Sequence, residues 1–164
     1  MSAMKKSNKT KIIIWSSVLG IIFLLAVICL SFSKMIKVPS SYANLLSELQ
    51  NQTQYKLISL DKKDGSDNIQ VYNMEFEKGI NVDFYICQSK KDAKRKYEEL
   101  TCHSIVTTIT VMDNSRRIFK RDNKYIQVFK YHNKNGEDFV VNVYSNNKNV
   151  MGQFIKYYFA LCEV

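Results

Sequence analysis

A long apolar run without a charged side chain, residues 12–33, is the strongest pattern in the chain. A helix over this run would rise about 33 Å, which is enough to cross the hydrocarbon core of a bilayer. The apolar part of a signal peptide is shorter, roughly 7 to 15 residues. The run therefore predicts a retained transmembrane helix at residues 12–33.

Lysines flank the predicted span unequally. Four of them lie in residues 1–11, which contain no acidic residue, whereas Lys34 and Lys37 follow the span. Positive charge is usually kept on the cytoplasmic side of a single span. We therefore expect a single-pass protein of the cell membrane with a cytoplasmic tail at residues 1–11. A connector at residues 34–41 and an extracellular domain at residues 42–164 follow.

Two other fates of the apolar run stay open. Ser31 and Ser33 occupy the small-residue positions that a signal peptidase requires, so cleavage after Ser33 would release the domain. Cys29 is a candidate for lipid attachment, but Ile28 stands before it, where a lipobox has a small residue. Retention as an anchor fits the length of the run best.

Two pairs of segments beyond the connector alternate apolar and polar residues, which is typical of β-hairpins. The first pair spans residues 69–88 and turns at Lys78 and Gly79, and the second spans residues 124–145 and turns at Asn135 and Gly136. β-rich segments predict further strands at residues 55–60, 105–112 and 117–120, and a polar loop is expected at residues 61–68.

Apolar residues at helical spacing predict three helices in the domain, at residues 41–50, 89–100 and 150–162. In the middle helix, Ala93, Tyr97 and Leu100 lie on one face. Ser89 can cap that helix by accepting hydrogen bonds from its first free backbone amides.

The second hairpin repeats the pattern of the first. Residues 69–71 and 126–128 both read Ile-Gln-Val, Gly79 corresponds to Gly136 at the same spacing, and a helical segment follows each hairpin. We therefore predict an α+β domain, in which one antiparallel sheet is built from two hairpin-helix units. Its helices are expected to cover one face of the sheet.

The segment "FYICQSKKDAKRKYEEL", residues 84–100, joins a strand directly to a charged helix, and a later hairpin leads into a C-terminal helix. This order resembles a group of small, uncharacterised, membrane-attached extracytoplasmic proteins of low-GC Gram-positive bacteria, many of them lipoprotein-like. The resemblance implies no catalytic or binding residue.

Four lysines before the apolar run account for part of the net charge of +9, and residues 12–164 carry +5 with acidic and basic residues interspersed. This distribution fits a solvated surface better than a nucleic-acid groove, so nucleic acid is not favoured as a partner. Two basic clusters are candidate contacts for anionic lipid headgroups or envelope polymers. They comprise Lys90, Lys91, Lys94, Arg95, Arg116, Arg117, Lys120 and Arg121.

The C-terminal helix carries more apolar residues than one face can hold. A helix that covers a sheet needs one apolar stripe, so the surplus has to be buried by another part of the domain or by a partner. The candidate partner interface, including self-association, is formed by Phe154, Tyr158 and Phe159.

No residue pattern places a nucleophile beside a base. Cys102 and His103 are adjacent, but consecutive residues of a helix point about 100° apart, so they do not face each other. His132 has no acidic or thiol partner nearby in the sequence and is expected on the surface of a hairpin. An enzyme is therefore not favoured, and no catalytic residue is predicted.

A metal site is not predicted either. Asp61, Asp64 and Asp67 are three residues apart, whereas an EF-hand loop places its ligands at alternate positions and closes with a glutamate. No other motif indicates a cofactor. The sequence therefore predicts a membrane-anchored extracytoplasmic binding or accessory module without catalytic activity. The alternative is a secreted or surface protein that contacts anionic envelope polymers.

Overall fold

The chain divides into two compact units, Met1–Lys34 and Met35–Val164. The computed structural model describes residues 18–23 of the first unit. Of the second unit it describes residues 38–51, 54–65, 69–102, 107–111 and 113–159.

The predicted transmembrane helix is not found in the part of the chain that the structure describes. Among the described residues, no helix is both long and apolar enough to cross a membrane. Of the predicted span, residues 18–23 are described and helical, a stretch that rises about 9 Å against the roughly 30 Å of a bilayer core. This finding contradicts the predicted anchor, the single-pass topology, and the cell-membrane and extracellular localisation. Cys29, Ser31 and Ser33 lie outside the described residues.

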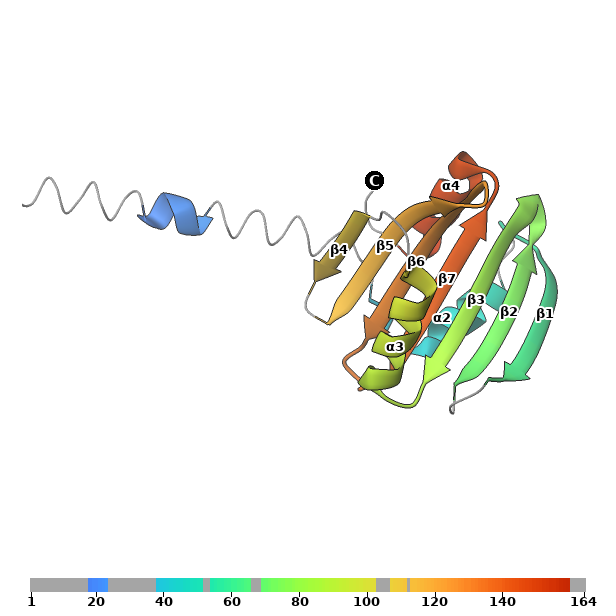
Figure 1. The fold of residues 1–164 in the computed structure, drawn as a ribbon, viewed down its shortest axis with the longest axis horizontal. Helices are drawn as coiled ribbons and strands as arrows, with labels where there is room; N and C mark the ends of the chain where they lie inside the picture. The colour runs from blue at the N-terminus through green and yellow to red at the C-terminus, as the bar shows by residue number, and fades with distance from the viewer. Residues whose placement is uncertain are drawn as a thin grey trace, which may run out of the picture. The chain divides into compact units, whose positions relative to one another are not determined.

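A seven-stranded antiparallel sheet dominates the second unit (Figure 1). Its strand order is β1-β2-β3-β7-β6-β5-β4. The strands are β1 (Leu57–Asp64), β2 (Gln70–Phe76), β3 (Ile80–Cys87), β4 (Thr107–Val111), β5 (Asn114–Arg121), β6 (Lys124–His132) and β7 (Asp138–Ser145). The predicted hairpins β2–β3 and β6–β7 are confirmed.

Three helices accompany the sheet in the described part of this unit: α2 (Tyr42–Gln50), α3 (Lys90–Thr101) and α4 (Lys148–Tyr158). The Ser89 cap of α3 is confirmed, because the Ser89 hydroxyl accepts from the Asp92 amide at 3.2 Å. After β3 the chain leaves the middle of the sheet, and it re-enters at the far edge with β4. Successive hairpins then bring β7 back beside β3.

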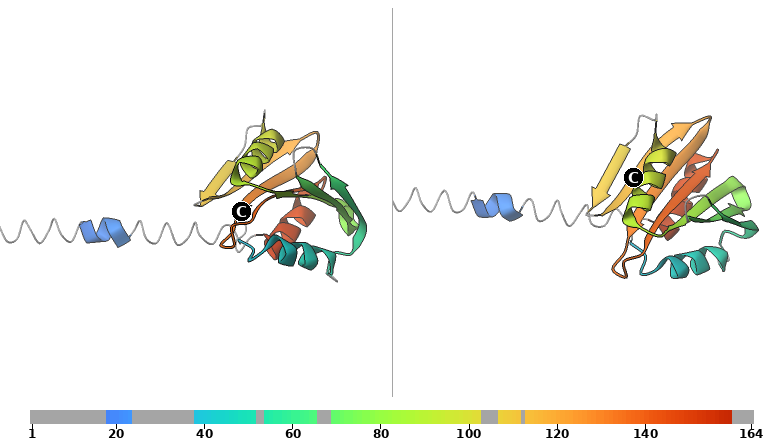
Figure 2. Two further views of the ribbon diagram at one scale, coloured as in Figure 1. Left: turned by 90° about the horizontal axis from the view of Figure 1, so that it is seen from below. Right: turned by 60° about the horizontal axis from the view of Figure 1, so that its bottom comes forward.

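Helices lie on both faces of the sheet, with α3 on one side and α2 and α4 on the other (Figure 2). The reason is that β3 and β7 carry apolar residues on one face along their length and on part of the other face. Phe84 and Val141 belong to the core beneath α2 and α4, whereas Tyr85 and Val140 belong to the core beneath α3. The predicted α+β class with helices on one face is therefore wrong, and the fold is mostly sheet.

The predicted repeat holds for the hairpins but not for the helices. Phe84 and Val141, which correspond in the repeat, pair directly across β3 and β7. A two-fold axis through that pair and perpendicular to the sheet would relate the hairpins, but it would keep both helices on the same face. Because α3 and α4 lie on opposite faces (Figure 2), the sheet is not built from two equivalent hairpin-helix units.

The β5–β6 turn consists of Asp122 and Asn123, whose φ angles are 48° and 63°. Asparagine tolerates this left-handed conformation, whereas a β-branched residue is strained in it. We expect Asn123→Val to lower the free energy of unfolding by about 1 kcal/mol, measured by urea denaturation. Asn123→Gly is the matched control, since glycine adopts the same φ freely; a loss of equal size in both variants would contradict the explanation.

Candidate functional site

Arg116 is a buried arginine on β5 with 2% of its surface exposed. Its Nε and Nη2 atoms both donate to Gln127 Oε1 on the neighbouring strand β6, at 2.9 and 2.6 Å. Its guanidinium carbon lies 5.3 Å from the centre of the Phe129 ring, which pairs with Arg116 across the two strands. Strand pairing therefore holds the guanidinium against an amide and an aromatic ring.

The charge of Arg116 is not matched by these contacts. Gln127 is neutral, and Nη1 is buried without a hydrogen-bond partner among the described residues. Burial lowers the pKa of Arg116, while the nearby Tyr131 hydroxyl raises it. The Tyr131 hydroxyl is also buried without a described partner. The guanidinium is charged even so, because arginine is not deprotonated in proteins.

Arg116 lines a cleft of about 520 Å³ between α4 and the strands β5 and β6. On the floor, Arg116 and Gln127 lie beside the buried Met151 and Ile155. At the rim, α4 contributes exposed polar side chains. The cleft-lining residues are Arg116, Ile118, Phe119, Tyr125, Gln127, Lys148, Asn149, Met151, Gly152, Gln153, Ile155 and Lys156.

The start of α4 fixes where its rim side chains lie. Asn147 caps the helix, and its side chain accepts from the amides of Asn149 and Val150. The Ser145 hydroxyl at the end of β7 accepts from the Asn147 amide at 3.1 Å. The apolar face of α4 is then buried against the sheet, so the next helical positions border the cleft.

This geometry suits an anion. A guanidinium nitrogen with free N–H groups donates charge-assisted hydrogen bonds to a carboxylate or phosphate oxygen, and these are about twice as strong as bonds between neutral groups. Low solvent access strengthens the attraction further. Pockets of roughly 300 to 1,000 Å³ typically hold small molecules, so the cleft can accommodate an organic anion.

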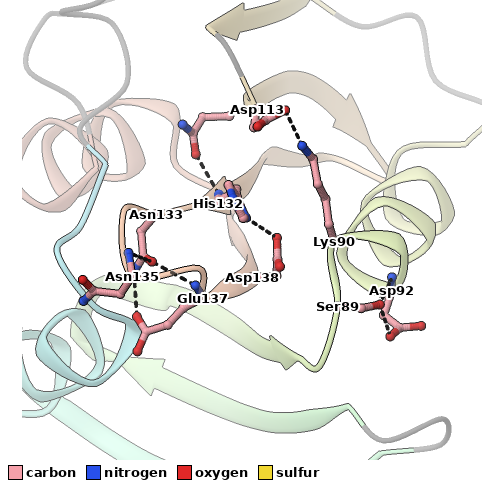
Figure 3. Close-up of polar contacts among 10 residues, drawn as sticks. Ser89, Lys90, Asp92, Asp113, His132, Asn133, Asn135, Glu137 and Asp138 are labelled. Atoms are coloured by element: carbon pink, nitrogen blue, oxygen red, sulfur yellow. Dashed lines mark hydrogen bonds and ion pairs between the residues drawn. The ribbon is translucent and has the colours of Figure 1, made fainter.

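A second polar cluster lies at one end of the sheet (Figure 3). His132 Nδ1 and Asp138 Oδ1 are 2.9 Å apart, and the Lys90 ammonium lies 2.6 Å from Asp113. The expected place of His132 in a hairpin, with 34% of its side chain exposed, is found, but the expected lack of an acidic partner is wrong. The pairing of His132 with Asp138 across the β6–β7 hairpin was the signal that could have revealed it.

Cys87 also lies at this end of the sheet, where it pairs with Asp138 across β3 and β7. Burial raises the pKa of the Cys87 thiol to about 12, and the charges of Asp92 and Asp138 add to this effect. The thiol is therefore protonated near neutral pH. Because β7 lies between β3 and β6, Cys87 and His132 are on strands that do not adjoin.

Other candidate residues are placed apart or lie outside the described residues. Cys102 is exposed and its thiol donates to the Glu99 carbonyl, while His103 is not described. Asp61 belongs to β1 and pairs with Lys63, and Asp67 is not described. No group of three metal-ligating side chains occurs in the described ranges.

The basic residues predicted to contact polyanions do not form one patch. On α3, Lys94 pairs with Glu98 and Arg95 with Asp92, and Lys91 is exposed. Lys90 of the same helix pairs with Asp113. The second cluster lies on β5, where alternate side chains point to opposite faces. Arg117 donates to the Thr101 hydroxyl and Arg121 to the Leu100 and Cys102 carbonyls, whereas Lys120 lies over the Tyr125 ring on the face of Arg116.

The predicted partner interface is buried. Phe154, Tyr158 and Phe159 belong to the core between α4, α2 and the sheet. Tyr157 is the large apolar residue of α4 that is exposed. The structure thus accounts for these three side chains within the domain, through α2 and the rings of Tyr55 and Phe76.

Comparisons with known proteins concern the fold. The sequence matches no protein-family model, and a search of curated proteins found no match. Among solved structures, the chain is similar to the crystal structure of a GTP binding regulator from Thermotoga maritima, with a TM-score of 0.52 and 17% sequence identity. The likeness covers 77% of this chain and 92% of that chain. At this identity it shows that the two proteins share a fold.

Proposed function

We propose that the sheet domain is a non-catalytic binding module for a small organic anion, which Arg116 holds in the cleft beneath α4. The observation that supports this proposal is the buried guanidinium of Arg116, a residue that lines the cleft and whose Nη1 has no described hydrogen-bond partner. A buried charge without a counter-charge costs several kcal/mol of stability. An anionic ligand would supply that counter-charge, so the cost is expected at a binding site.

The absence of catalysis is part of the proposal. A nucleophilic thiol needs a low pKa and a base in contact. The burial of Cys87 acts in the opposite direction, and its strand does not adjoin that of His132. Contact of the exposed basic residues with anionic polymers stays a separate prediction.

Guanine nucleotides are the first ligands to test, because the structural neighbour is described as a GTP binding regulator. The sequence contains no GxxxxGK segment, which in P-loop proteins wraps the phosphates in backbone amides. Any nucleotide bound by this chain would therefore have to use a different site. Arg116, with Lys148 at the rim of the cleft, is the candidate for its phosphates.

Calorimetric titration of the full-length protein with GTP, inorganic phosphate and a panel of organic acids tests the proposal. We expect at least one organic anion to bind, and Arg116→Gln to weaken its binding about 10- to 100-fold, since a charged hydrogen bond contributes about 1.5 to 3 kcal/mol. Lys91→Gln is the matched control, because it removes the same charge from an exposed position on α3. Equal affinities of the two variants, or no anion bound by the wild type, would refute the proposal.

A further inference from the structure

We infer that the ligand of the α4 cleft is a hydrophobic carboxylic acid, an apolar body with a single negative charge. The inference rests on the proposed function and specifies its ligand class. It starts from the composition of the cleft floor, where Arg116 is the cation and Gln127 is already engaged by it. The side chains around this pair are apolar: Ile118, Tyr125, Met151 and Ile155.

The guanidinium of Arg116 is one buried positive charge, so it neutralises one negative charge of a ligand. Gln127 accepts one hydrogen bond from Nε and one from Nη2, and Nη1 is a buried donor without a described partner. The other two cations that line the cleft, Lys148 and Lys156, are exposed on α4, where water and salt screen their attraction. A triphosphate placed against Arg116 would bring more negative charge into the buried floor than the guanidinium neutralises. A monocarboxylate brings an equal charge.

The apolar lining favours a ligand with a hydrocarbon body. A cleft of about 520 Å³ is far larger than acetate requires, and water in contact with the half-buried Ile118 and Tyr125 gains few hydrogen bonds there. Each methylene transferred from water to such a surface is expected to strengthen binding roughly fourfold. Affinity should therefore rise with the length of the acid until the cleft is full.

Titrations with hexanoate, octanoate and decanoate, below their micellar concentrations, test this inference on the full-length protein. We expect affinity to rise from hexanoate to decanoate, and decanol, which has the same body without the charge, to bind at least tenfold more weakly than decanoate. Acetate should bind too weakly to measure. Arg116→Gln should reduce decanoate to the affinity of decanol, with the fold checked by circular dichroism.

A second variant acts on the apolar half of the site. Ile118 is half-buried and lines the cleft. Ile118→Asn should therefore weaken the binding of decanoate more than the binding of hexanoate while leaving Arg116 in place. Binding of GTP that depends on Arg116, without binding of decanoate, would overturn the ligand class and leave the proposed function standing. Binding of decanoate that Arg116→Gln does not change would overturn both.

Discussion

Phe154→Ala is expected to lower the free energy of unfolding by about 3 to 5 kcal/mol, the usual cost of removing a buried aromatic ring. Phe154 is 0% exposed. Its ring centre lies 5.1 Å from that of Tyr55, 5.2 Å from that of Phe76 and 4.6 Å from that of Tyr158. Alanine would therefore leave a cavity where α4 packs against the sheet and against the segment before β1. Urea denaturation followed by circular dichroism measures the loss.

Tyr157→Ala is the matched control for this prediction. Tyr157 belongs to the same helix, but 49% of its surface is exposed, so its removal is expected to change stability by about 0.5 kcal/mol or less. Comparing Phe154→Ala with Tyr157→Ala also distinguishes a role of α4 in the core from a role as a partner interface. A folded Phe154→Ala protein with unchanged stability would show that the ring is not part of the core.

Local features of the fold could be predicted because neighbouring residues determine them. The turns at Gly79 and Gly136 have φ angles of 70° and 76°, which glycine adopts without strain. Ser89 caps α3 because a serine hydroxyl directly before a helix reaches its free amides. Each of these features depends on a few consecutive residues, and each is found where the pattern placed it.

Long-range features could not be predicted in the same way. One such feature is the position of β4 at the far edge of the sheet, beyond β5. Another is the placement of α3 on its own face, where it buries the second side of β3 and β7. The hairpin pattern predicts one helix-covered face, whereas Tyr85 and Cys87 form a second core with α3. A strand that is apolar on both faces is typical of a central position, and this signal was available.

The candidate site shows the same limit. Adjacency in the sequence places Arg116 and Arg117 in a single basic cluster. In a strand, adjacent residues point to opposite faces, so Arg117 reaches Thr101 on α3 while Arg116 lies under α4. Alternation alone could have separated the two, but the burial of Arg116 depends on α4, which follows 32 positions later in the chain.

The buried pair of Arg116 and Gln127 is expected to lower the stability of the unliganded domain. Gln127→Leu alone removes the acceptor of two hydrogen bonds from a buried cation, so it should cost about 2 to 3 kcal/mol. Arg116→Met alone removes the charge but leaves the buried Gln127 oxygen without its donors, and the two effects should nearly cancel. The double variant removes both problems and should raise the free energy of unfolding by about 1 to 3 kcal/mol.

Urea denaturation of the four proteins in this double-mutant cycle measures the coupling between the two side chains. A stabilised double variant that no longer binds the anion would indicate that Arg116 is retained for its ligand at the expense of stability, as functional sites often are. Additive effects of the two substitutions, or a double variant less stable than Gln127→Leu, would mean that the pair supports the fold. In that case the unpartnered Nη1 would no longer argue for a ligand.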